Sequence, residues 1–155
     1  MSYKIPISVL VLIHTADLRI LLLERADRPG FWQSVTGSCH LDETLLETAQ
    51  REVQEETGLD TRAYELTDWG RHNEFEIYQT WRWRYAPGVT HNTEHVFSLL
   101  LPDALPIQLA PREHLQYLWV PGLEAADKVF SSTNAQAIRE LPQRLSAKVF
   151  KTREG

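Results

Sequence analysis

Hydrophobic and polar positions along this 155-residue chain form short extended runs around one strongly patterned helix. Two apolar runs near the N-terminus, residues 5–14 and 19–24, predict strands that could form a hairpin, and residues 31–36 predict a short third strand. Residues 95–101 and 115–120 are comparable runs and predict further strands. We therefore expect a sheet whose strands come from segments along most of the chain.

The clearest alternation of apolar and polar residues lies between residues 74 and 85. Odd positions are apolar apart from Gln79, and even positions are mostly polar or charged. A period of two predicts an extended strand with one apolar face, followed by a turn at residues 86–88. Residues 60–69 predict a weaker strand before it. In this interpretation three aromatic side chains belong to the core: Phe75, Trp81 and Trp83.

The helix predicted over residues 44–58 carries its own start and stop signals. Thr44 followed by Glu47 forms a capping box, in which each residue satisfies a backbone N–H near the other. Gly58 suits the left-handed residue that ends a helix. The pattern predicts a helix that packs on the sheet through an apolar stripe. The stripe consists of Leu45, Ala49 and Val53.

Two further helices are predicted towards the C-terminus. A weak pattern covers residues 123–129, and Thr133 with Gln136 forms a second capping box for a helix that Pro142 interrupts. Strands gathered around one helix, with another helix at the end, predict an α+β fold, an α/β/α sandwich with a mixed sheet. The length fits a single domain over residues 1–155 with a sizeable core.

Composition and charge narrow the classes of function. The formal net charge of −5 argues against broad electrostatic capture of a nucleic acid polymer. No apolar run approaches the roughly 20 residues of a membrane span. Residues 5–13 could pass for the core of a signal peptide, but Pro6 and the missing small-residue cleavage site argue against it. Cys39 is the one cysteine, so no internal disulfide can form, and we expect a cytoplasmic location.

The chemistry suggested by the sequence centres on three glutamates of the predicted helix. At roughly 100° per residue, Glu52, Glu55 and Glu56 lie on one side of the helix, where their negative charges repel one another. Mg²⁺ and Mn²⁺ prefer oxygen ligands and would remove this repulsion. Taken alone, the cluster is equally well explained as a solvated acidic face. A metal site would let an acidic protein bind a polyphosphate through bridging cations.

A wider pattern distinguishes these alternatives. Gly37, five residues, Glu43, seven residues and then the run R-E-V-Q-E-E-T-G-L over residues 51–59 resembles the Nudix box without a departure. The resemblance implies the Nudix fold, with its mixed sheet, and hydrolysis of a nucleoside diphosphate linked to another group, with Mg²⁺ or Mn²⁺ as the cofactor. It also implies that Arg51 pairs with carboxylates, Glu43 among them. At Gly37, the missing Cβ lets the backbone bend sharply into the loop.

The resemblance also implies roles for individual acidic residues. Glu52, Glu55 and Glu56 are the expected metal ligands, and Arg51 is expected to orient them. A further carboxylate usually comes from a loop outside the box, and Glu113 is the candidate for a metal ligand or general base. Alternatively, Arg51 makes a surface pair worth only tenths of a kcal/mol, and Glu113 is an exposed loop acid.

Segments outside the box narrow the resemblance further. Residues 31–37, 84–90, 92–94 and 113–115 are similar to those of MutT-like Nudix enzymes of the folate pathway. This similarity implies that pyrophosphate is released from dihydroneopterin triphosphate, leaving the monophosphate. The alternative is hydrolysis of dATP or oxidised dGTP, because a purine and a pterin present similar edges. A catalytically silent Nudix module is a third alternative, disfavoured because every box glutamate is present.

A small-molecule triphosphate of this kind needs two sets of contacts. Its flat heteroaromatic ring suits aromatic side chains and a few placed polar groups. Its phosphates suit cationic side chains, hydroxyl groups and exposed backbone. The candidates for the ring are Trp32, Phe75, Glu76, Ile77 and Tyr78, and the candidates for the phosphates are Lys4, Arg25 and Ser131. The Thr36 hydroxyl and the Gly37 backbone are candidates for contact with either phosphate or metal.

Overall fold

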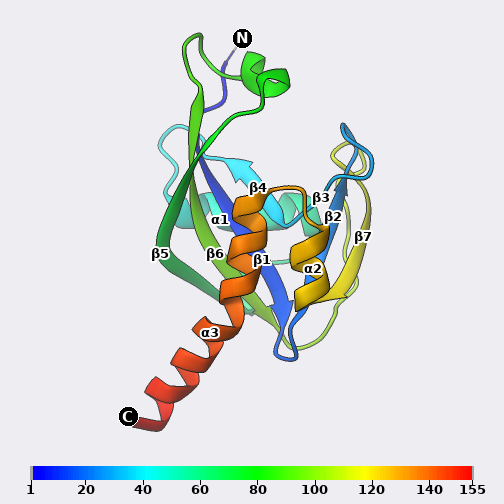
Figure 1. The fold of residues 1–155 in the computed structure, drawn as a ribbon, viewed down its shortest axis with the longest axis vertical. Helices are drawn as coiled ribbons and strands as arrows, with labels where there is room; N and C mark the ends of the chain where they lie inside the picture. Colours follow the sequence, from blue (N-terminus) through cyan, green and yellow to red (C-terminus); the bar gives the residue numbers. More distant parts are fainter. Residues whose placement is uncertain (1, 155) are drawn as a thin grey trace.

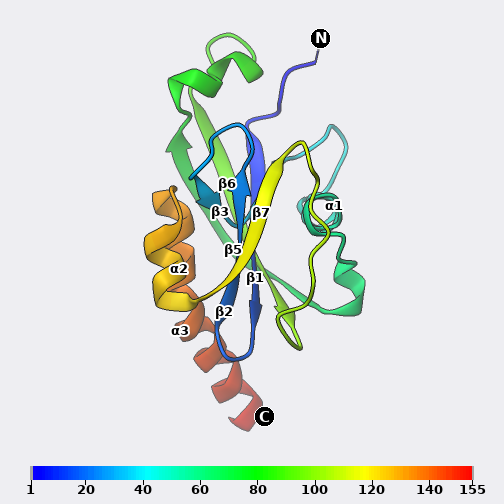
Figure 2. The same ribbon diagram turned by 90° about the vertical axis from the view of Figure 1, so that its right-hand side faces the viewer.

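The computed structural model describes residues 2–154, with side chains through residue 146. A mixed sheet occupies the centre, helix α1 covers one face, and helices α2 and α3 cover the other (Figure 2). The last turns of α3 extend beyond the sheet, at the end opposite the N-terminus (Figure 1). The predicted α/β/α sandwich with a mixed sheet is therefore confirmed.

The elements follow the predicted order closely. The strands are β1 (Ile7–Thr15), β2 (Arg19–Arg25), β3 (Trp32–Gln33), β4 (Val35–Ser38), β5 (Glu65–Glu76), β6 (His91–Leu101) and β7 (His114–Pro121). The α-helices are α1 (Leu45–Thr57), α2 (Gly122–Lys128) and α3 (Ser132–Glu154), and two short 3₁₀ helices are η1 (Thr61–Ala63) and η2 (Gln79–Arg84). Among the described residues, no helix is both long enough and apolar enough to cross a lipid bilayer.

Strand β1 is the centre of the sheet. It pairs in parallel with β6 along its whole length and antiparallel with β4 over its first half. Strand β2 pairs with β3 and β7, and β5 pairs with β6 at the other edge. The register places Val9 opposite Gly37 on β4 and opposite His95 on β6. The first halves of β1 and β6 and the whole of β4 therefore meet at one end of the sheet.

The core consists of two apolar layers, one on each face of β1. Val9, Val11 and Ile13 belong to the layer that includes the apolar side of α1, whereas Leu10 and Leu12 belong to the layer that includes residues of α2 and α3. Successive side chains of a strand point to opposite faces, so a strand covered on both sides needs a continuous apolar run. This explains the unbroken hydrophobic segment near the N-terminus.

Helix α1 begins and ends as predicted. The Thr44 hydroxyl accepts the Glu47 backbone N–H at 3.1 Å, and the Glu47 carboxylate accepts the Thr44 backbone N–H at 2.9 Å, which completes the capping box. Gly58 has a left-handed backbone with φ of 76°. Ala49 and Val53 are fully buried against the sheet. Local signals thus determine the position of this helix.

The prediction of a strand over residues 74–85 is wrong beyond Glu76, because β5 ends at that residue. The chain turns into η2, because Arg82 Nε donates to the Ile77 carbonyl at 2.9 Å and Tyr78 stacks on Trp81 with ring centroids 5.2 Å apart. Residues three apart share a side in a 3₁₀ helix and lie on opposite faces of a strand. The aromatic residues expected in the core lie elsewhere: Phe75 and Trp81 are half-buried, and Trp83 is 71% exposed.

The predictions for the last helix also need correction. Helix α3 starts one residue before Thr133, and its cap is Ser131, whose Oγ accepts the Asn134 backbone N–H at 3.4 Å. Pro142 does not interrupt it. Proline removes one backbone hydrogen bond, but Leu141 before it is buried and Leu145 after it packs on the same apolar layer. Packing on the sheet continues past the proline and maintains the helix.

Candidate functional site

A cleft of about 1160 Å³ opens at the end of the sheet where β1 and β6 begin. Carboxylates of α1 line one part of it, and aromatic side chains from the β5–η2 segment line another. Figure 1 shows the N-terminal segment and η2 together at this end. The cleft is lined by most of the predicted site residues: Lys4, Arg25, Thr36, Gly37, Glu52, Glu56, Phe75, Glu76, Ile77, Tyr78, Glu113 and Ser131.

Three predicted site residues lie outside this lining. Trp32 is 8% exposed and packs in the core layer shared with α2 and α3, with the Lys128 ammonium 4.8 Å from its ring. The Glu55 side chain is half exposed and accepts a hydrogen bond from Arg51 Nη1 at 3.2 Å. Arg51 does not line the cleft, but it donates hydrogen bonds to Glu43 and Glu52. The structure thus separates Trp32 and Glu55 from the residues that it gathers around the cleft.

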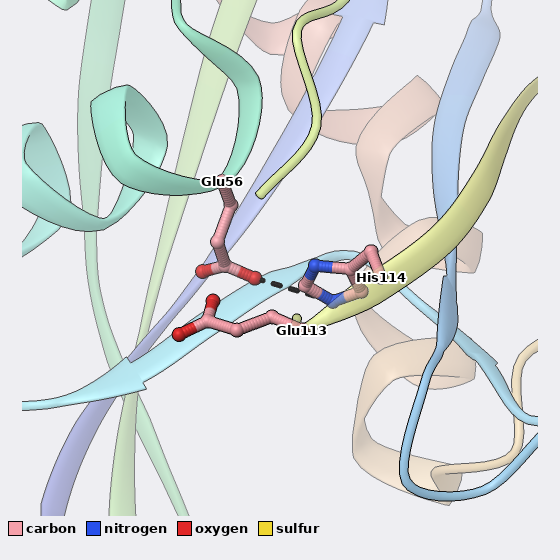
Figure 3. Close-up of side chains that lie close together, drawn as sticks. All are labelled: Glu56, Glu113 and His114. Carbon is pink, nitrogen blue, oxygen red and sulfur yellow. Dashed lines mark ion pairs between the residues drawn. The ribbon is translucent and has the colours of Figure 1, made fainter. Parts of the chain in front are cut away.

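Glu52 and Glu56 lie one helical turn apart on α1, and both are buried, with 9% and 1% of their surface exposed. Glu56 Oε1 lies 3.5 Å from His114 Nε2. Glu56, Glu113 and His114 each bring one potential ligand atom to within 4.8 Å of the others. Figure 3 shows Glu56 on α1 pointing towards Glu113, which directly precedes β7, and His114, the first residue of β7. Among the described residues, Glu56 Oε2 is buried without a hydrogen-bond partner. A buried carboxylate oxygen without a partner is costly unless the group binds a proton or a cation.

The electrostatics of this pair follow from its burial. Burial raises the pKa of Glu56, and the charge of Glu52 raises it further. Burial also raises the pKa of Glu52, against hydrogen bonding from Glu56 and Arg51. A proton shared between the two carboxyl groups would relieve their repulsion. A hard divalent cation, for which carboxylate oxygens are suitable ligands, would relieve it too, so these residues fit such an ion.

Gly37 provides the space that Glu52 occupies. A Cβ at this position would lie 2.0 Å from Glu52 Cδ and 2.2 Å from its Oε1. Gly37 belongs to β4 and is not among the glycines with positive φ. The predicted sharp bend is therefore wrong: glycine is needed here because a carboxylate packs against the backbone.

Arg51 joins the box residues into one network. Its Nε and Nη2 contact the two oxygens of Glu43 at 2.8 and 2.9 Å, its Nη2 also donates to the Ser38 carbonyl at 2.9 Å, and its Nη1 donates to Glu52 Oε1 at 2.7 Å. The guanidinium lowers the pKa of Glu43 to about 2. The predicted pair with Glu43 is present. A bidentate contact of this kind fixes the orientation of both the guanidinium and the carboxylate.

His114 is a member of the cluster that sequence reasoning left without a role. Burial and the charge of Arg25 lower its pKa to about 4, so the imidazole is neutral at neutral pH. Its Nε2 lies 3.3 Å from Gln33 Nε2 and 3.5 Å from Glu56 Oε1. The sequence held one indication of this role, because His114 directly follows the candidate Glu113 just before a predicted strand.

Cationic side chains line the same cleft, and Arg25 on β2 pairs across the sheet with His114 of the acidic cluster. Arg25 donates to both oxygens of Asp27 at 2.7 Å and to Gln33 at 2.9 Å, and its guanidinium lies 4.5 Å from the centre of the Trp81 ring. Burial lowers the pKa of Lys4, and the charge of Arg84 lowers it further. The predicted phosphate contacts Lys4 and Arg25 therefore face the same space, and Arg84 joins them.

Two hydroxyl groups predicted to contact phosphate already have protein partners. Thr36 Oγ1 donates to the Val9 carbonyl at 2.9 Å, which ties β4 to β1. Ser131 Oγ lies 3.0 Å from Thr133 Oγ1 and caps α3. Both residues line the cleft, so their oxygen atoms remain available as acceptors.

The aromatic part of the cleft is a cluster that the sequence only partly indicated. Tyr78 stacks on Trp81, and the Phe130 ring lies 6.2 and 6.1 Å from the two. Ile77 beside them is 3% exposed, and Glu76 is paired with Arg82. Phe130 precedes α3 and is distant in sequence, so no local pattern could connect it with residues 75–81.

Two buried polar residues of β6, Asn92 and Glu94, line the floor of the cleft and were not predicted as site residues. They are 3% and 5% exposed. In the sequence they continue the alternation that places Val96 in the core. Polar residues in the inward phase of a strand are unusual, and this was the signal that could have identified them.

Comparison with known proteins places these features in context. A family model described as NUDIX domain matches residues 4–141. The chain is 48% identical over 141 residues to the dihydroneopterin triphosphate diphosphatase of Escherichia coli K12, covering 89% of this chain and 93% of that protein. The protein of the same name from Haemophilus influenzae is 42% identical over 144 residues, covering 90% and 89%. The solved structure of the E. coli dihydroneopterin triphosphate pyrophosphohydrolase covers 90% of this chain and 97% of its own, with a TM-score of 0.85 and 47% identity.

Proposed function

The chain belongs to the Nudix family, and from this membership we propose that it hydrolyses dihydroneopterin triphosphate to dihydroneopterin monophosphate and pyrophosphate. Relatives named for this substrate are 42% and 48% identical to it. The observation that carries the proposal is the cleft, which joins a buried carboxylate cluster to an aromatic, polar region. A pterin triphosphate has two corresponding parts, a charged tail and a flat ring.

We propose Mg²⁺ as the cofactor, with Mn²⁺ as the alternative. Glu52 and Glu56 would hold the ion, with Glu113 facing them, because carboxylate oxygens suit hard divalent cations. The unpartnered Oε2 of Glu56 supports this assignment. Glu55 would join them only by leaving Arg51. When bound, the ion neutralises triphosphate charge and lowers the pKa of a bound water.

The remaining groups of the cluster supply proton transfer and orientation. Glu113 is exposed at its position before β7, where water reaches it, and we assign it as the acceptor of the proton from the attacking water or as a further ligand. Arg51 Nη1 donates a 2.7 Å hydrogen bond to Glu52 Oε1 and so orients this carboxylate. Neutral His114 contacts Glu56 without adding charge to the cluster.

The cationic side chains suit the phosphate tail of the substrate. Arg25 is already oriented by Asp27 and Gln33, so little side-chain entropy is lost when it binds an anion. Lys4 and Arg84 add charge beside it. The aromatic group around Tyr78 lies in the same cleft and offers faces on which a pterin ring can stack.

The test is a direct comparison of kcat/KM on dihydroneopterin triphosphate and on dATP, with the products identified. We expect at least about a tenfold preference for the pterin substrate, with release of the monophosphate and pyrophosphate. A clear preference for dATP would instead identify a nucleoside triphosphate pyrophosphohydrolase. Binding of either compound without hydrolysis at saturating Mg²⁺ would indicate a ligand-binding module.

A further inference from the structure

Glu94 is a buried carboxylate that the hydrolytic chemistry does not use. It lies on β6, opposite Ser8 on β1 and Asn73 on β5, and is 5% exposed. Its Oε1 has no hydrogen-bond partner among the described residues, although it lines the cleft. Burial raises the pKa of Glu94, and hydrogen bonding from the neutral side chains of Thr133 and Asn73, rather than the charge of a basic group, opposes this rise. A structural ion pair does not explain its presence.

Asn92 provides a second open acceptor on the same face of β6. Its Nδ2 donates to Ser8 Oγ at 2.6 Å, which fixes the direction of the amide, and its Oδ1 is buried without a partner among the described residues. Residues two apart on a strand share a face, so the two acceptors point to the same side of the sheet. Buried polar atoms are almost always satisfied. Two unsatisfied acceptors in one cleft therefore indicate ligand atoms that donate hydrogen bonds.

The chemistry of these acceptors restricts what can bind them. A phosphate would repel the carboxylate, and it has cationic partners elsewhere in the cleft. An amino group on a heteroaromatic ring has two N–H bonds and suits an acceptor pair. In the strand register Asn92 lies opposite Phe75, which also lines the cleft, so a ring there can reach the floor with its edge.

We propose that Glu94, together with Asn92, accepts hydrogen bonds from the amino-bearing edge of the substrate's heterocycle and so selects the ring that the enzyme accepts. The pterin identity of that ring rests on the proposed function. The recognition itself extends to any ring with an amino group at this edge. An oxygen in place of the amino group would face the Glu94 carboxylate with another acceptor, and a site left with unpaired polar groups rejects such an analogue strongly.

The test uses Glu94→Gln in the full chain. The KM for dihydroneopterin triphosphate should rise at least about tenfold, with a much smaller change in kcat, because the contact is with the ring and not with the reacting phosphates. Wild type should prefer dATP over deoxyinosine triphosphate, which has an oxygen in place of the amino group, by at least about tenfold. In Glu94→Gln this ratio should fall to within about threefold, because a carboxamide can turn its N–H₂ towards an oxygen.

The matched control is Glu74→Gln on β5, an exposed glutamate that does not line the cleft, and it should keep both wild-type values. Thermal unfolding should show that Glu94→Gln is at least as stable as wild type, because a buried carboxyl is removed. If Glu94→Gln does not fold, Glu94→Asp, which retracts the carboxylate by one methylene, should raise the KM for the pterin substrate instead.

A folded Glu94→Gln with wild-type KM and an unchanged ratio would overturn the proposal, as would a folded Glu94→Asp with wild-type KM where Glu94→Gln is unfolded. Failure of the proposed function is a separate result. Wild type would then prefer dATP to dihydroneopterin triphosphate, and the ratio of dATP to deoxyinosine triphosphate in the two proteins would still decide the role of Glu94.

Discussion

The carboxyl groups of Glu52 and Glu56 owe their unusual pKa values first to burial and only then to neighbouring charges. Glu52 and Glu56 are carboxyl groups that the fold withdraws from water one helical turn apart, and both have raised pKa values because burial penalises their charged forms. Such an arrangement costs stability unless a proton or cation compensates it. A site prepared for a divalent ion is the physical explanation that fits both residues.

Gly37→Ala tests how closely the backbone supports this site. The new Cβ would overlap the Glu52 carboxylate, which lies at the end of a flexible side chain and would move away. We expect kcat to fall by about 10²-fold, because small displacements of a reacting constellation are costly, while the free energy of unfolding changes by less than about 1 kcal/mol. Steady-state kinetics and urea denaturation measure the two quantities.

Gly122→Ala is the matched control for this substitution. Its Cβ would meet the Leu18 carbonyl at an ordinary 3.5 Å, and the residue does not line the cleft. Wild-type kcat is expected for Gly122→Ala. Full activity in Gly37→Ala would show that Glu52 does not need the position that it occupies here.

At the scale of elements, α1 and β4 act as one unit. The capping box fixes where α1 starts, and Arg51 bonds both to Glu43 in the loop before it and to the Ser38 carbonyl at the end of β4. The helix is thereby held to the strand that carries Gly37. The η2 turn is the opposite case, because alternating aromatic residues resembled a strand while Arg82 and Trp81 formed contacts that only a turn allows.

Glu43→Gln tests the link between the loop and α1 through its dependence on pH. Because Arg51 lowers the folded-state pKa of Glu43 from 4.5 to about 2, the pair contributes stability above pH 4.5 that is lost as the pH falls towards 2. We expect Glu43→Gln to be about 2 kcal/mol less stable than wild type at pH 7, with the difference shrinking between pH 4.5 and 2. Urea denaturation over this range measures it. A constant difference at all pH values would contradict the assignment.

At the scale of the molecule, the cleft combines segments that are far apart in the chain. The sequence could identify α1 and its glutamates, because the capping residues, apolar stripe and carboxylates all lie within residues 43–58. It could not place Phe130 beside Tyr78, or Asn92 beside Ser8, because these contacts depend on the sheet register and on the start of α3. Trp32 shows the converse, an aromatic residue near the site whose strand turns it into the core.

The central claim is that buried carboxylates of α1 bind the divalent ion on which hydrolysis depends. The most direct measurement is the dissociation constant for Mn²⁺, from paramagnetic resonance of the free ion, together with kcat at saturating metal, for wild type, Glu56→Gln and Glu55→Gln. Glu56→Gln should bind Mn²⁺ at least about tenfold more weakly and lose about 10²-fold in kcat. Glu55→Gln should lose less, because its side chain is half exposed beside Arg51. Wild-type Mn²⁺ affinity and kcat in Glu56→Gln would contradict the account.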